Sequence, residues 1–171
     1  KELPAAGQDK IVAIIDIGAN YSSLFVLNGM KLVFSREEKF GSMQLINALV
    51  ENYKMTSEEA VEAIREGKLP EDYETNVLMP FKKTVLLQIK RTLQFFYSTS
   101  QHNFVDLILL AGGIARQPGL RQDIQEELGI ITSIANPLAP MSFSKRVDLN
   151  AINSDAPALM VACGLALRNI D

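Results

Sequence analysis

Ile11-Val12-Ala13-Ile14-Ile15-Asp16-Ile17-Gly18 is the stretch that decides the fold. It opens with an apolar run that shows no alternation, the pattern of a strand buried on both faces of a sheet. An aspartate and, two positions later, a glycine follow this run, which predicts a sharp turn at the end of the strand. The glycine allows the backbone to bend tightly and allows a ligand to approach the main chain closely.

The rest of the chain alternates between strand and helix patterns. Further strands are expected at 23–27 and 31–34, joined by the hairpin dipeptide Asn28-Gly29, and at 107–110 and 130–135. Helices are expected at 43–53, from the capping box of Thr56 to Gly67, at 76–97, from Pro118 to 128 and from 155 to 167, with a surface loop at 69–74. This order of elements predicts an α/β lobe with a mixed sheet and helices on both faces.

Composition indicates a soluble globular protein. The net charge of −3 argues against nucleic acid as a standing partner. No signal peptide is visible, and no apolar run approaches the roughly 20 residues of a membrane span, so a cytoplasmic location is expected. Cys163 lies in an apolar run and is expected to be a buried thiol, while His102 is expected in a polar surface loop.

The turn after Asp16 has two interpretations. Successive backbone amides at Gly18, Ala19 and Asn20 could form a nest for phosphate oxygens. The Asp16 carboxylate, at the end of the strand, could then hold hydrated Mg²⁺, which prefers one or two carboxylates together with phosphates. The turn could also be an ordinary connection between strands, in which Asp16 bonds its own backbone.

A second glycine turn follows the apolar strand at 107–110. Gly112 and Gly113 lie between this strand and the helix expected from Pro118, and ligands of α/β sheets bind at such strand ends. The missing side chains would leave a flat surface for a planar base or a ribose, although two glycines also suit a tight strand-to-helix link. No Gly-Lys-Ser/Thr follows, so the turn is not a Walker loop.

Charged residues on two predicted helices are further candidates. Glu62 and Arg65 stand three apart on one helix face, where they could reach a nucleotide's ribose and base edge or form a surface ion pair. Lys82, Lys83, Lys90 and Arg91 lie mostly off the apolar stripe of the long helix, and this basic face is expected to be solvated, with a binding patch as the alternative.

Taken in order, these segments resemble motifs of the actin, FtsA and heat-shock chaperone superfamily. Asp16-Ile17-Gly18-Ala19-Asn20 looks like its second phosphate motif, Ala111-Gly112-Gly113 through Leu120 looks like its adenosine motif, and residues 155–168 look like its closing helix. Within that superfamily the chain is most similar to the PilM family of cytoplasmic type IV pilus assembly proteins. The segments that carry this resemblance are Leu69-Pro70-Glu71-Asp72-Tyr73-Glu74, Pro80-Phe81-Lys82, Leu93-Gln94-Phe95-Phe96 and the closing helix.

The resemblance implies a scaffold that binds ATP between two lobes, of which this chain matches the second. That lobe would run over 11–171, with an inserted helical subdomain at about 38–75, after a linker at 1–10. The phosphates would lie on Gly18, Ala19, Asn20 and Ser22, with Mg²⁺ held by Asp16 through water, and the nucleoside would lie on Glu62, Arg65, Gly112 and Gly113.

The resemblance also implies partners. A PilN-type inner-membrane pilus protein would dock mainly on the other lobe, and a pilus motor ATPase or platform protein would be a second partner. Such a protein would lie in the cytoplasm, peripheral to the inner membrane.

Several departures from the superfamily pattern bear on catalysis. The first phosphate motif and the helix with the water-positioning residue are not found in this chain. Ser22 or Ser23 replaces the threonine that often follows the phosphate turn, and Arg65 stands near where a lysine is expected. These departures predict ATP binding with weak or no hydrolysis. The alternatives are a small-molecule kinase of the same superfamily, which needs an acceptor site and a base, and a structural lobe without nucleotide.

Overall fold

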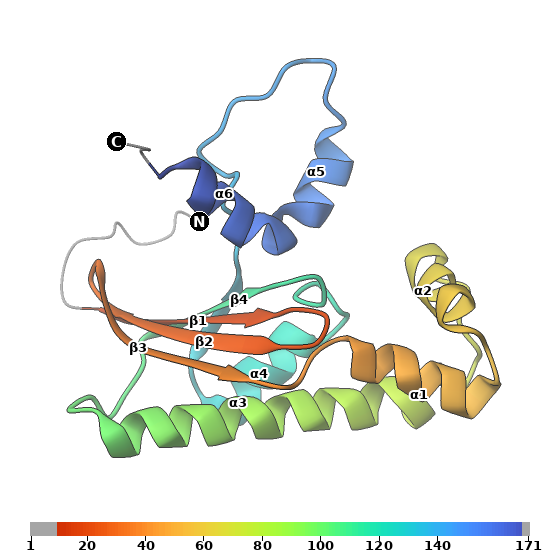
Figure 1. Cartoon of the computed structure of the whole chain (residues 1–171), viewed down its shortest axis with the longest axis horizontal. Coiled ribbons are helices and arrows are strands. Elements are labelled where there is room, and N and C mark those ends of the chain that lie inside the picture. The colour runs from red at the N-terminus through yellow and green to blue at the C-terminus, as the bar shows by residue number, and fades with distance from the viewer. Residues whose placement is uncertain (1–9, 169–171) are drawn as a thin grey trace.

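A mixed sheet in the strand order β3-β2-β1-β4-β5 forms the centre of the computed structural model, which describes residues 10–168 (Figure 1). The strands are β1 (Ile11–Ile17), β2 (Ser22–Asn28), β3 (Lys31–Glu38), β4 (Leu107–Ala111) and β5 (Ile131–Ile134). The first three form an antiparallel meander, while β4 and β5 run parallel to β1. The linker predicted at 1–10 lies outside the described residues, except for Lys10.

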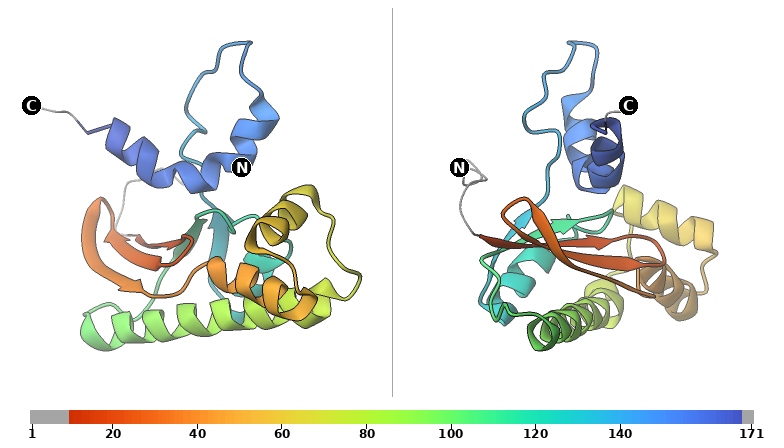
Figure 2. Two further views of the ribbon diagram at one scale, coloured as in Figure 1. Left: turned by 45° about the vertical axis from the view of Figure 1, so that its right-hand side comes forward. Right: turned by 60° about the vertical axis from the view of Figure 1, so that its left-hand side comes forward.

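Helices and helical turns fill the rest of the described chain. They are α1 (Met43–Tyr53), α2 (Ser57–Glu66), the π-helical turn η1 (Glu74–Leu78), α3 (Met79–Thr99), α4 (Leu120–Leu128), α5 (Leu149–Asp155), the 3-10 turn η2 (Ala156–Leu159) and α6 (Met160–Ala166). Helices α3 and α4 cover one face of the sheet, and the segment from α5 to α6 lies over the other face (Figures 1 and 2). The predicted α/β fold with helices on both faces is confirmed.

The core lies between the sheet and α3. On β1 the odd-numbered residues from Ile11 to Ile17 are buried against this helix, whereas Val12, Ile14 and Asp16 are only half-buried on the opposite face. The expectation that this strand is buried on both faces is therefore only half correct. The reason is that the α5–α6 segment covers its face less completely than α3 covers the other.

Capping and turn residues in the sequence predicted most helix and strand boundaries to within a few residues. Helix α1 has the predicted bounds, and the capping box of α2 is formed, with Thr56 accepting from the Glu59 amide and Glu59 accepting from the Thr56 amide. The hairpin lies one residue later than predicted, because Asn28 pairs with Lys31 and the loop is Gly29-Met30.

Two segments differ from the prediction. The surface loop expected at 69–74 contains the buried Tyr73 and leads into η1, so α3 begins at Met79. The closing helix is broken into α5, η2 and α6, and α5 begins before the expected start because the Asp148 side chain caps it, accepting from the Asn150 and Ala151 amides. No helix in residues 10–168 combines the length and the apolar character needed to cross a bilayer.

Candidate functional site

The turns that follow β1 and β4 meet at one edge of the sheet. The two strands are parallel neighbours, with Asp16 paired with Ala111, so both turns begin at the same level. The carboxyl ends of parallel strands are where α/β sheets bind ligands. The register therefore joins the two candidate turns, which lie about ninety residues apart in sequence, into one site.

Gly112 is the residue at which the turns touch. Its φ of +92° lies in the region that favours glycine, and an added Cβ would lie 2.7 Å from the Ile17 carbonyl carbon and 2.8 Å from Asp16 Oδ1. Its amide donates to the Pro157 carbonyl of η2 at 2.9 Å. Gly112 thus packs β4 against the Asp16 turn and anchors the closing segment beside it.

Gly113 has a different environment. No atom lies within 4 Å of the position its Cβ would take, and its φ is not positive. The residue is exposed next to the buried Gly112. Of the two glycines, Gly113 is thus the one with open space above the backbone.

Two amides of the turn after β1 have no protein partner among the described residues. The Gly18 amide donates within the turn, to the Tyr21 carbonyl at 2.9 Å. Ala19 and Asn20 are exposed, and in residues 10–168 their amides donate to no protein acceptor. An anion at this turn would therefore find the amides of Ala19 and Asn20 free, but not that of Gly18.

Backbone hydrogen bonds from the start of α1 stabilise the turn after β1. The Ser42 amide donates to the Gly18 carbonyl and the Met43 amide to the Ala19 carbonyl, both at 2.9 Å. Gly41 packs so closely that its Cβ would lie 2.6 Å from the Gly18 oxygen. The sequence analysis missed this support, although a glycine followed by a serine before a helix was a signal for it.

Asp16 is half-buried on the sheet face away from α3. Burial raises the pKa of its carboxyl above the ordinary value of 3.8. In the described part of the chain no hydrogen bond reaches this carboxylate, so it does not bond its own backbone as the simpler interpretation required. No group of three or more metal-ligating side chains occurs among residues 10–168. A lone carboxylate suits Mg²⁺, which keeps several waters and takes its remaining ligands from phosphates.

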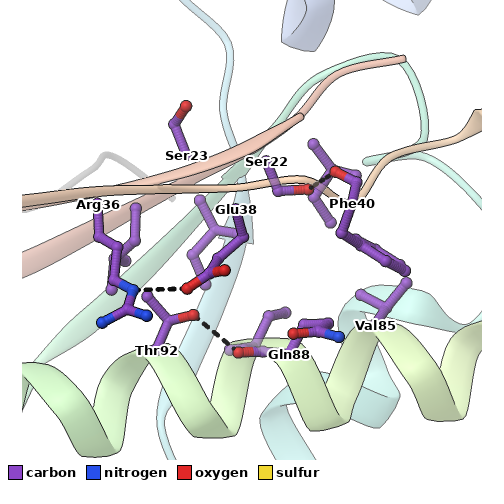
Figure 3. A pocket seen from close by; sticks show the side chains of 12 residues that line it. Ser22, Ser23, Arg36, Glu38, Phe40, Val85, Gln88 and Thr92 are labelled. Carbon is purple, nitrogen blue, oxygen red and sulfur yellow. Dashed lines mark hydrogen bonds and ion pairs between the residues drawn. The ribbon is translucent and has the colours of Figure 1, made fainter. Parts of the chain in front are cut away.

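The side chains of the two serines after the turn point to opposite faces of the sheet. Ser22 pairs with Ile17, and its hydroxyl donates to the Phe40 carbonyl at 2.7 Å, at the border of a cavity of about 30 Å³ between the sheet and α3 (Figure 3). Ser23 pairs with Asp16 and points away from that cavity (Figure 3). The phosphate contact predicted for Ser22 does not fit this geometry, and the hydroxyl on the Asp16 face belongs to Ser23.

Glu62 and Arg65 lie outside the edge formed by the two turns. They form an exposed ion pair on α2 at 3.6 Å. Helix α2 lies beyond the carboxyl end of the sheet together with α1 (Figure 1). No described contact joins either side chain to Gly112 or Gly113, so the structure gives them the geometry of a surface pair.

The other residues singled out from the sequence lie in ion pairs, on the surface or in contact with an aromatic ring. Of the basic residues on α3, Lys83 and Arg91 are exposed and Lys90 pairs with Glu127 of α4. Lys82 is not solvated as expected, because its side chain is largely buried where it pairs with Asp123 of α4 at 2.6 Å. Cys163 is half-buried, not buried as predicted, because the apolar α6 is largely exposed. His102 is half-buried and stacks on Phe96 at 6.2 Å between ring centroids.

Solved structures with the same fold come from several actin-like proteins. The chain is similar to a structure titled "PilM-PilN type IV pilus biogenesis complex", with 25% identity and a TM-score of 0.81 over 95% of this chain and 47% of that one. It also resembles the ethanolamine utilization protein EutJ from Carboxydothermus hydrogenoformans, with 20% identity and a TM-score of 0.60 over 94% of this chain and 49% of that one. The archaeal actin homolog Ta0583 matches with 15% identity and a TM-score of 0.62 over 96% of this chain and 51% of that one. The chain thus spans about half the length of these proteins.

The match to one protein family covers nearly the whole chain. The family described as "Type IV pilus assembly protein PilM" matches residues 1–170. The actin-like sheet, the two turns at its edge and this match agree with one another, and the chain belongs to the PilM family of type IV pilus assembly proteins.

Proposed function

We propose that this lobe forms one side of an ATP–Mg²⁺ site at the carboxyl ends of β1 and β4. The observation that supports the proposal most is the packing of Gly112 against Asp16 and Ile17. Through this packing, a half-buried carboxylate without a described partner, two exposed amides and an open glycine lie at one edge. Each of these is a feature that a bound nucleotide would use.

Each group has a specific role in the proposal. The amides of Ala19 and Asn20 bind phosphate oxygens, as successive amides in a turn do. Asp16 orients a water of the Mg²⁺ shell, and the bound cation supplies positive charge that neutralises the phosphates. Gly113 provides the open surface on which the nucleoside lies.

The proposed role of the whole protein is that of a scaffold. It couples inner-membrane pilus proteins to the cytoplasmic pilus motor, with a PilN-type protein as its membrane partner. The solved PilM–PilN complex supports this partner, because this chain matches about half of a chain in that structure. We expect ATP binding with little or no turnover, and a location at the cytoplasmic side of the inner membrane.

Calorimetric titration of ATP–Mg²⁺ into the intact protein tests the nucleotide site. Asp16→Ala is expected to weaken binding about tenfold or more, in line with the loss of groups that orient metal ligands. Gly113→Trp is expected to abolish binding by filling the open surface. Gly113→Ala adds one methyl group in open space and should bind as the parent does. Unchanged affinity in both Asp16→Ala and Gly113→Trp would exclude the site.

The two serines provide an internal control for the orientation of the turn. Ser23→Ala should weaken binding, whereas Ser22→Ala should leave it unchanged because that hydroxyl bonds the Phe40 carbonyl on the other face. The 1–171 chain alone is expected to bind ATP weakly or undetectably, and micromolar binding by this chain would contradict a site shared between two lobes. Transfer of the γ-phosphate to an acceptor would instead indicate a kinase.

A further inference from the structure

The β2–β3 hairpin ends in an apolar tip, which we define as residues 27–32. It lies at the end of the sheet opposite the Asp16 turn (Figure 1). Met30 is 86% exposed in the loop and Leu32 is 52% exposed at the start of β3. Leu27 and Leu32 are cross-strand partners and therefore lie on one face of the hairpin. Large apolar side chains thus protrude into water where the sheet ends.

The charge within the tip is opposite to that of the chain as a whole. The chain carries a net charge of −3, yet no Asp or Glu occurs between Ile17 and Arg36. Lys31 lies within the tip. Lys10 is exposed beside it, because its carbonyl accepts from the Gly29 amide at 3.1 Å. Two cations therefore lie in or beside the tip, and the carboxylate of Asp106 lies next to Lys10, since it accepts from the Ile11 amide at 2.8 Å.

The tip is also held in one conformation by its own backbone. The Gly29-Met30 loop is closed by the Asn28–Lys31 pair, and Gly29 has a φ of +58°, which suits glycine. A register shift next to Val26 marks a β-bulge that twists the hairpin. Little conformational entropy remains to be lost when such a tip contacts a partner.

The size and shape of the tip decide which partner suits it. A stable protein interface buries about 800 Å² on each side, far more than a hairpin loop with two protruding side chains offers. A lipid surface makes no demand for a complementary shape, and anionic headgroups attract flanking lysines. Apolar side chains that enter the acyl boundary while lysines stay at the headgroups are the pattern of interfacial membrane binding.

We propose that the hairpin tip contacts an anionic lipid surface directly. Met30 and Leu32 enter the boundary between headgroups and acyl chains, and Lys10 and Lys31 bind the headgroup phosphates. This contact goes beyond the proposed nucleotide site, from which it is separated by the length of the sheet. It is a weak second anchor, because roughly 1 kcal/mol per lysine corresponds to about a fivefold change in partitioning for each.

Co-sedimentation of the intact protein with vesicles tests the proposal. The probe is phosphatidylethanolamine with a minority of phosphatidylglycerol, compared with phosphatidylcholine alone. Binding is expected to the anionic vesicles only. Lys31→Glu should reduce the partition coefficient at least about fivefold, and Met30→Glu should reduce it to the level seen with phosphatidylcholine.

Leu87→Glu is the matched control, since this leucine on α3 is 47% exposed, close to the 52% of Leu32 in the tip. The control should bind vesicles as the parent does, and circular dichroism should show all variants folded. Equal binding by the parent and Met30→Glu, or no binding by the parent, would overturn the proposal. So would a concentration-dependent oligomer, seen by sedimentation velocity, that Met30→Glu disrupts without any change in vesicle binding.

Discussion

Replacing Gly112 by alanine tests the contact that joins the two turns. The added methyl group would lie 2.7 Å from the Ile17 carbonyl carbon and 2.8 Å from Asp16 Oδ1, distances that real Cβ atoms essentially never show. Both neighbours belong to the end of β1, which is paired on either side and cannot yield easily. The φ of +92° adds backbone strain for any residue with a Cβ.

The expected loss of stability is the sum of these two effects. A side chain in a left-handed or similar conformation costs about 1–2 kcal/mol. Overpacking against surroundings that cannot move costs a further amount of roughly 1–3 kcal/mol. The total of about 2–5 kcal/mol is a large fraction of the roughly 5–15 kcal/mol by which a domain is stable.

Urea unfolding followed by circular dichroism measures this difference. Gly113→Ala is the matched control, because its methyl group meets no atom within 4 Å and its stability should stay within about 0.5 kcal/mol of the parent. The Gly112 variant should also lose ATP affinity in the intact protein, since the turns are forced apart. If Gly112→Ala were as stable as Gly113→Ala, the close approach of the two turns would be refuted.

Three other predictions follow from single contacts. Burial raises the pKa of the Asp16 carboxyl above 3.8, so ionisation of this group lowers the stability of the fold as pH rises through its pKa. Asp16→Asn should therefore have a higher melting temperature than the parent at neutral pH, and this gain should vanish in acid. A lower melting temperature of the variant at neutral pH would contradict the prediction. Thr56→Ala removes the cap of α2 and should cost about 1 kcal/mol in chemical unfolding, unlike the neighbouring Ser57→Ala. Asp123→Asn should lower the melting temperature more than Glu127→Gln, because Asp123 pairs with the largely buried Lys82 whereas Glu127 pairs with the more exposed Lys90. Equal melting temperatures of the two variants would show that the burial of Lys82 is unimportant.

The elements that sequence analysis placed well are those with complete local signals. Helix α2 begins at the capping box of Thr56 and ends at Gly67, whose φ of +68° closes the helix. Helix α1 carries an apolar stripe that includes Leu45 and Leu49, both buried. In both cases the information lies within a few residues of the boundary, because capping and helical periodicity are short-range effects.

The elements that it misjudged depend on distant contacts. Tyr73 was expected in a surface loop, but it is buried, and its hydroxyl accepts from Gln117, a residue far along the chain, at 3.4 Å. The apolar run around Cys163 predicted a buried thiol, yet Cys163 is only half-buried and the nearby Leu165 is exposed in the described structure. Composition does not reveal which surface a helix packs against, so neither result could be read from a local window.

The sequence by itself determined the order of the elements and the two turns, because strand patterns, glycines and caps act locally. It also determined that Asp16 lies near the carboxyl end of a strand and that Gly112 and Gly113 follow another. Only the tertiary structure decided that β1 and β4 are parallel neighbours with Asp16 opposite Ala111, which puts Gly112 against Asp16. It also decided that Ser23, and not Ser22, shares the face of Asp16, because the register of the strand pairing sets the side to which each residue points.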